Sequence, residues 1–93
     1  MKKYEAMLVL KPADELAEDT INQVKNLITT HKGKLDNIDI WGKKTLAYDI
    51  DGYTEGCYVL VHFFGNRGLR LGLDKFLKLN ENVLRHLVVN SVS

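Results

Sequence analysis

The chain has little cysteine, proline or net charge, and each scarcity excludes a class of protein. Cys57 is the only cysteine, so no disulfide can form within the chain, and a lone thiol is typical of a reducing compartment. Pro12 is the only proline, and no repeat or linker divides the chain, so residues 1–93 are expected to form one domain. The 13 basic and 12 acidic residues leave a formal net charge of +1. A protein that binds nucleic acid without the help of a partner protein is usually much more basic.

Long hydrophobic runs are also missing. No apolar run approaches the roughly 18 residues that a membrane-spanning helix needs. The first segment, MKKYEAMLVLKP, has two lysines followed by alternating residues and no small-residue cleavage site, which predicts a β-strand rather than a signal peptide. We therefore expect a cytoplasmic location and no membrane partner.

The spacings of the common metal and catalytic sites are absent too. The three histidines fall in three different predicted elements, and no pair has the spacing of a metal site. Nothing near Cys57 in the sequence supplies the base that a cysteine nucleophile needs. The stretch GNRG, Gly65 to Gly68, joins a predicted strand to a predicted helix and is not followed by the G-K-[ST] of a P-loop. We expect no catalytic residue, metal, cofactor or small-molecule substrate.

What the sequence does contain is a clear alternation of two hydrophobic periods. Period-two alternation predicts strands at about residues 3–10, 34–50, 57–64 and 83–89. Helical spacing predicts one helix that begins after its N-cap at Asp14, and a second helix over about residues 66–79. Gly33 is expected to supply the left-handed residue that ends the first helix. The stretch DGYTEG, Asp51 to Gly56, predicts the turn between the second and third strands, with Asp-Gly as its strongest signal, and Gly42 predicts a bend in the second strand.

The order β-α-β-β-α-β predicts an α+β fold of the ferredoxin-like type. Right-handed crossovers place both helices on one face of a four-stranded antiparallel sheet, with the first and third strands in its centre. The other face is then uncovered, and the strand alternation directs Met7, Val9, Tyr58 and Leu60 toward it. An apolar patch on this face would favour a protein partner.

Three stretches of the sequence together resemble one protein family. The shared features are a basic residue with Tyr-Glu and a proline in the first strand, a W/L-G-basic-basic-x-L-A-Y run, and a closing strand with one arginine. They are met by Lys2 or Lys3 with Tyr4, Glu5 and Pro12, by Trp41 to Tyr48, and by Glu81 to Val89. The chain is similar over nearly its whole length to the sixth protein of the bacterial small ribosomal subunit. It differs at Asp49, where the family commonly has proline.

The resemblance implies a ferredoxin-like structural protein without enzymatic activity, bound to the central domain of small-subunit ribosomal RNA. For contact with the RNA we expect Lys2 and Tyr4 in the first strand and Arg85 in the last. Arg70 and Lys78 on the second helix are further candidates. Phosphate contacts by such residues position a protein on RNA without reading its sequence.

The resemblance also implies joint assembly with the eighteenth small-subunit protein, which agrees with the low net charge. The second strand is expected at an edge of the sheet, where its backbone is available to this partner. The residues expected to contact it are Trp41, Lys43, Lys44, Leu46 and Tyr48. The two lysines would also discourage indiscriminate pairing at this edge.

Two other functions are compatible with the fold alone. Ferredoxin-like domains also act as protein-interaction or ligand-sensing modules, because a fold does not fix a function. An enzyme of the acylphosphatase kind would need an arginine beside a phosphate-binding turn and an asparagine on the sheet. The stretch from Gly65 to Arg70 is faintly similar to such a turn.

Overall fold

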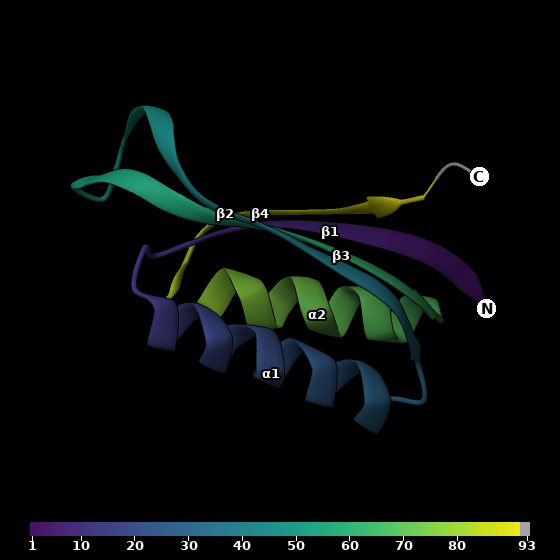
Figure 1. Cartoon of the computed structure of the whole chain (residues 1–93). Helices are drawn as coiled ribbons and strands as arrows, with labels where there is room; N and C mark the ends of the chain where they lie inside the picture. Colours follow the sequence, from purple (N-terminus) through teal and green to yellow (C-terminus); the bar gives the residue numbers. More distant parts are fainter. Residues whose placement is uncertain (92–93) are drawn as a thin grey trace.

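The computed structural model of the chain describes residues 1–91 and has the expected α+β architecture (Figure 1). Its elements are β1 (Lys2–Leu10), α1 (Asp14–Thr30), β2 (Lys34–Ile50), β3 (Tyr53–Gly65), α2 (Arg67–Leu79) and β4 (Val83–Asn90). The sheet is antiparallel with the order β2-β3-β1-β4, so the expected central strands are confirmed. Both helices cover the same face of the sheet. Within residues 1–91, no helix is long and apolar enough to cross a membrane.

The hydrophobic core lies between the sheet and the two helices. Alternate residues of β1 and β3 point into it, because neighbouring side chains on a strand project to opposite faces. The helices contribute residues at helical spacing. The core contains Tyr4, Ala6, Leu8, Leu10, Val59, Val61 and Phe63 from the strands, and Ile21, Val24, Ile28, Leu69, Leu73 and Leu77 from the helices.

The ends of α1 differ from the sequence expectation. Ala13 is the N-cap and makes no side-chain hydrogen bond, so Asp14 is the first helical residue rather than the cap. The left-handed residue after the helix is Lys32, with φ of 62°, and not Gly33. Gly33 is needed for close packing instead, because a Cβ there would clash with the Leu69 side chain and lie 2.9 Å from the carbonyl oxygen of Phe64.

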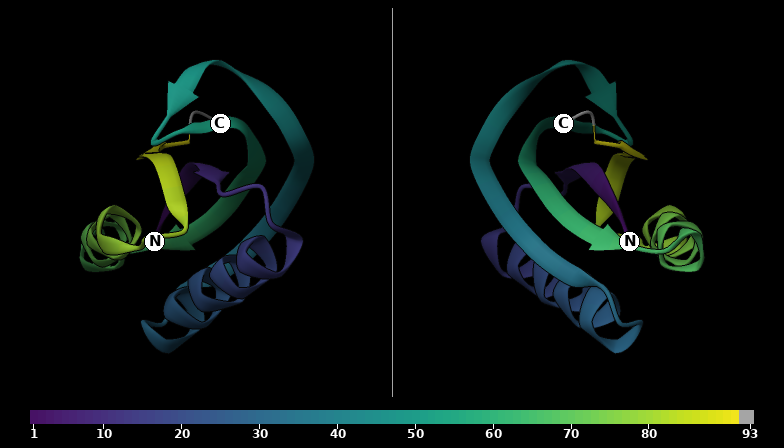
Figure 2. Two further views of the ribbon diagram at one scale, coloured as in Figure 1. Left: turned by 90° about the vertical axis from the view of Figure 1, so that its left-hand side faces the viewer. Right: turned by 90° about the vertical axis from the view of Figure 1, so that its right-hand side faces the viewer.

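The β2–β3 hairpin is longer than expected, because β3 begins at Tyr53 rather than at Cys57. Its turn residues Asp51 and Gly52 have φ of 50° and 83°, which suits the right-handed twist of a two-residue hairpin. The register of β2 shifts next to Gly42, where φ is also 83°, so the predicted bend is confirmed. Beyond this bend, residues 44–56 form a hairpin arm that curls over the sheet (Figure 2).

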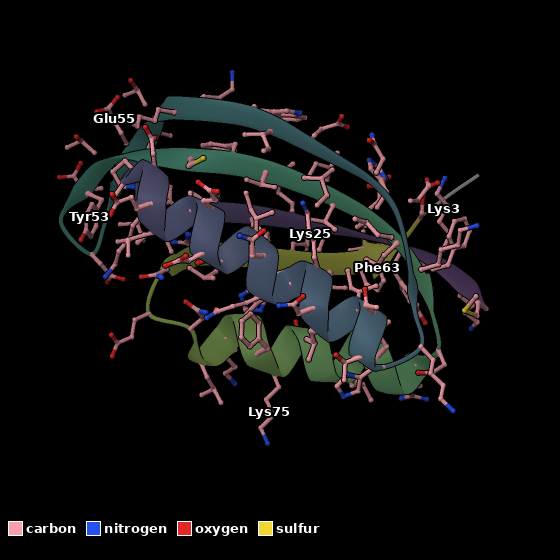
Figure 3. All side chains as sticks on the ribbon, turned by 60° about the horizontal axis from the view of Figure 1, so that its bottom comes forward. Lys3, Lys25, Tyr53, Glu55, Phe63 and Lys75 are labelled. Carbon is pink, nitrogen blue, oxygen red and sulfur yellow. The ribbon has the colours of Figure 1, made fainter. Side chains whose placement is uncertain are left out.

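The hairpin arm covers one end of the sheet face that carries no helix, which we call the open face. Val9 points to this face but is only 8% exposed, so the expectation that it is uncovered is wrong. Gly56 of the arm approaches Val9 and Leu46 so closely that a Cβ on it would contact both. In Figure 3, Tyr53 and Glu55 of the arm lie at the opposite end of the molecule from Lys3.

Candidate nucleic-acid and protein interfaces

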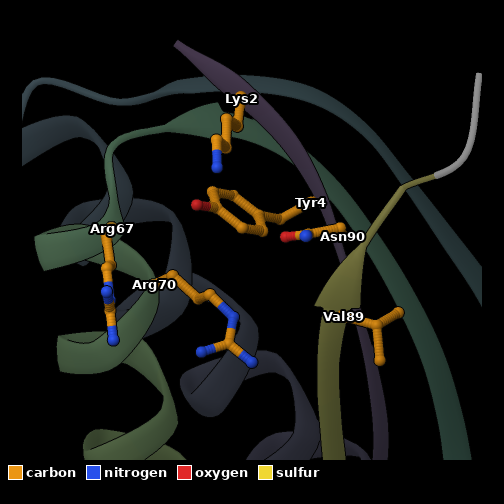
Figure 4. A pocket seen from close by; sticks show the side chains of 6 residues that line it. All are labelled: Lys2, Tyr4, Arg67, Arg70, Val89 and Asn90. Carbon is orange, nitrogen blue, oxygen red and sulfur yellow. The ribbon is translucent and has the colours of Figure 1, made fainter.

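Three of the five residues predicted to contact RNA converge at the end of the molecule where β1 begins. Lys2, Tyr4 and Arg70 line a pocket of about 380 Å³, together with Arg67, Val89 and Asn90 (Figure 4). The pocket therefore carries three cationic side chains from two elements. Of the described residues that line it, none is a carboxylate. We call it the basic pocket.

The local structure of α2 fixes two of these cations. Asn66 caps the helix, because its Oδ1 accepts a hydrogen bond from the Leu69 N–H at 2.8 Å. Arg67 and Arg70 are three residues apart in the first turns, which places them on the same side of the helix. Nη2 of Arg70 donates to the Val88 carbonyl oxygen of β4 at 3.3 Å and holds the guanidinium at the pocket wall.

Tyr4 belongs mainly to the core. It is 2% exposed, and its ring centroid lies 5.5 Å from that of Phe63. In Figure 4 its ring forms the back of the basic pocket, between Lys2 and Asn90. Such burial leaves almost no ring surface on which a base could stack, so Tyr4 lines the pocket without offering a stacking surface.

The other two predicted RNA-binding residues lie elsewhere. Lys78 is in the last turn of α2 and lines a different hollow with Lys11 and Tyr53, so about two helical turns separate it from Arg70. Arg85 projects from β4 onto the open face, where its guanidinium lies 5.5 Å from the ring centroid of Tyr48. The structure thus brings together only part of the predicted set.

The predicted partner-binding residues of β2 do not form one continuous strip. Leu46 is 9% exposed and buried on the side of the hairpin arm that faces the sheet, whereas Tyr48 is 62% exposed. Trp41 is exposed at the bend, and Lys44 is exposed beyond it. Lys43 faces the helix side, where its Nζ lies 3.7 Å from Oδ1 of Asp14. The outer edge of β2 pairs with no other described strand, as expected for an edge strand.

The open face is a second candidate for the protein interface. Met7, Tyr58 and Leu60 are half-buried on it, and the β4 residues Leu87 and Val89 are exposed beside them. Leu87 pairs with Met7 in the register, which places both on this face.

Sequence reasoning missed Leu87, Val89, Arg67 and Asn90 as individual candidates. The alternation of β4 was the signal for the first two, and the three-residue spacing in α2 was the signal for Arg67.

Two of the three histidines lie close to carboxylate groups. His62 lies between two carboxylates on the open face, 3.6 Å from Glu5 and 3.8 Å from Asp39. Nε2 of His86 lies 3.2 Å from Oδ1 of Asp74. In the part of the chain that the structure describes, no three such groups are placed to hold a metal ion.

Comparison with known proteins gives one family. The model of the ribosomal protein S6 family matches residues 3–90. The chain is 43% identical over 91 residues to small ribosomal subunit protein bS6 of Clostridioides difficile, covering 96% of this chain and 98% of that one. It is 37% identical over 92 residues to the same protein of Clostridium acetobutylicum, covering 97% of each.

A solved structure agrees with this assignment. Over 97% of this chain and 87% of the other, the fold is similar to 30S ribosomal protein S6 of Thermotoga maritima, with a TM-score of 0.89 and 26% identity. These relatives are named as ribosomal proteins and not as enzymes, which also decides against the acylphosphatase-like hypothesis. The chain belongs to the ribosomal protein S6 family of the small ribosomal subunit.

Proposed function

We propose that the chain binds the central domain of small-subunit ribosomal RNA through its basic pocket, in the cytoplasm and as part of the ribosome. The observation that carries this proposal is the convergence of Lys2, Arg67 and Arg70 around one hollow without a carboxylate among its described lining residues. Three cations with no carboxylate among the described residues that line the hollow concentrate positive potential where phosphates can approach, although the net charge of the chain is only +1.

We further propose that the eighteenth small-subunit protein docks on the open face and the adjoining edge of β2. Leu87 is 60% exposed beside Met7 and Leu60, and Trp41 is exposed on the edge strand. An apolar patch of this kind next to an unpaired strand edge is typical of a protein interface. The partner would also add basic surface that this chain lacks.

Salt dependence of binding tests the RNA contact. Binding to a central-domain RNA fragment is measured from low to high salt, with the partner protein present. Each of Lys2→Ala, Arg67→Ala and Arg70→Ala is expected to weaken binding and to reduce the slope of log K against log[salt] by about one unit. Lys75→Ala is the matched control, because Lys75 is exposed on α2 outside the pocket and points away from the sheet. Unchanged slopes for all three pocket variants would refute the proposal.

A charge on the open face tests the partner contact. Leu87→Glu is expected to weaken association with the partner at least about tenfold, because an unpaired charge would be buried in the interface. Leu79→Glu is the control, since Leu79 is also exposed but lies at the end of α2. Equal association of both variants with the partner, by calorimetry, would exclude the open face as the docking site.

A further inference from the structure

We propose that the basic pocket accepts one unpaired RNA nucleotide, with its phosphate between Lys2 and Arg67 and its base against Arg70 and Asn90. This rests on the RNA binding proposed above and specifies the kind of RNA that the site takes. The pocket volume of about 380 Å³ lies in the usual range of small-molecule sites, roughly 300–1,000 Å³. A hollow of this size suits a single nucleotide rather than the convex surface of a continuous duplex.

The phosphate position follows from the two exposed cations. Lys2 comes from the start of β1 and Arg67 from the first turn of α2, so they approach the pocket from separate elements (Figure 4). Both side chains lack a salt-bridge partner among the described residues. They are therefore free to bind a phosphate, Lys2 as a point charge and Arg67 with its forked donors.

The base position follows from Arg70 and Asn90. Arg70 is half-buried, and its bond to the Val88 carbonyl oxygen restrains the guanidinium plane. A guanidinium plane is one of the surfaces on which unstacked RNA bases are stacked by proteins. The Asn90 side chain, which points toward the Tyr4 ring in Figure 4, offers both a donor and an acceptor to the edge of a base.

The concave shape determines which RNA is preferred. A base inside a duplex cannot enter the pocket unless it is unstacked, which costs a few kcal/mol and costs least for a base that is already unpaired. The site should therefore prefer a stem with a bulged nucleotide over the same stem fully paired. An RNA whose bulged nucleotide lacks its base should bind only through the electrostatic contacts of its sugar-phosphate backbone.

Three labelled RNA hairpins of identical stem test this, one with a single-nucleotide bulge, one with an abasic bulge and one fully paired. Binding is measured by fluorescence anisotropy, with the full chain alone and with its partner protein. The bulged RNA is expected to bind about tenfold more tightly than either of the others. Equal affinity for the bulged and abasic RNAs would overturn the nucleotide pocket while leaving RNA binding intact. If none of the three RNAs showed salt-dependent binding, the proposed function would be refuted, and this inference with it.

Variants separate the two halves of the site. Asn90→Ala is expected to bring the ratio of bulged to abasic affinity close to one, with little change for the paired RNA. Lys2→Ala is expected to weaken binding of the bulged and abasic RNAs by the same factor, because it removes only a phosphate contact. Lys75→Ala should change neither. If Asn90→Ala left the ratio at its original value, the assigned base position would be wrong.

Discussion

The guanidinium of Arg85 lies over the ring of Tyr48, 5.5 Å from its centroid, and links β4 to the hairpin arm. At an exposed site such a contact stabilises by about 0.5–1 kcal/mol. The pair occupies the boundary between the arm and the uncovered part of the open face. From the sequence, Arg85 was expected to contact RNA and Tyr48 to contact the partner protein. In the structure the two side chains are in contact with each other.

A double-mutant cycle measures this contact. Arg85→Ala and Tyr48→Leu, singly and together, are expected to show a coupling of about 0.5–1 kcal/mol in urea unfolding. Arg85→Ala combined with Tyr53→Leu is the control and should be additive, because the Tyr53 ring lies near Lys11 instead. Additivity of the Arg85 and Tyr48 changes would mean that the contact does not hold the arm.

Cys57 gives the chain a specific pH dependence at the residue scale. Burial, and secondarily the charge of Asp14, raise the pKa of the thiol above its ordinary value, against an opposing effect of Lys43. The folded state therefore holds this proton more tightly than the unfolded state. The corresponding stability is complete below the unfolded pKa of about 8.5 and is lost as the pH rises through the folded pKa.

The free energy of unfolding of the unmodified chain should consequently fall more steeply above pH 8.5 than that of Cys57→Ala. Below pH 8 the difference between the two should not change with pH. Urea unfolding of both proteins at pH 6, 7, 9 and 10 measures the difference in the two ranges. A constant difference from pH 7 to pH 10 would show that the thiol has the same pKa in both states.

At the scale of elements, the two helices are stabilised by different interactions. α2 has a capped N-terminus, whereas α1 begins at Ala13 without a side-chain cap and relies on its buried face. Where α1 passes into β2, Gly33 lies against Leu69 of α2 and the backbone of Phe64 in β3. This single glycine therefore determines how closely four elements approach one another.

Gly33→Ala and Gly72→Ala form a matched pair that tests this packing. Gly33→Ala is expected to lower the free energy of unfolding by about 1–3 kcal/mol, because the backbone oxygen of Phe64 cannot move freely away from the new methyl group. Gly72→Ala should raise it by about 0.5–1 kcal/mol, since Gly72 lies inside α2 with open space around it. Thermal unfolding compares the two, and a stabilising Gly33→Ala would contradict the packing argument.

At the scale of the whole molecule, the hairpin arm curls over one end of the open face (Figure 2). Leu46 and Val9 are buried together although one comes from the edge strand and the other from a central strand. The arm thus packs against the open face of the sheet and is not a free docking edge. The stretch of β2 before the bend and the open face beyond the arm remain accessible to a partner, and on the arm Tyr48 is 62% exposed.

Truncating Leu46 tests whether the arm is integral to the fold. Leu46→Ala is expected to lower the free energy of unfolding by roughly 2–5 kcal/mol, because it removes buried methyl groups and leaves a cavity. Ile40→Ala, at an exposed position of the same strand, should cost less than about 1 kcal/mol. Equal effects in urea unfolding would mean that the arm does not pack on the sheet in solution.

The sequence by itself determined the order of the elements, the central strands and the core-facing residues. Val59, Val61 and Phe63 could be assigned to the core because side-chain alternation is a local property of a strand. The resemblance of the three quoted stretches likewise identified the family. Lys2 and Arg70 were found as candidates on that basis, but as separate basic residues rather than as one site.

Only the tertiary structure decided which of these residues meet. Lys2 and Arg67 are 65 positions apart, and their approach depends on the pairing of β1 with β3 and the start of α2 beside Gly65. The burial of Val9 and Leu46 depends on the curvature of the hairpin arm, which follows from register shifts in β2. Hydrophobic periodicity reports the face of an element but not its curvature, and the spacing of charges within one element does not show which charges of other elements they will meet. The core was therefore predictable from the sequence, whereas the basic pocket was not.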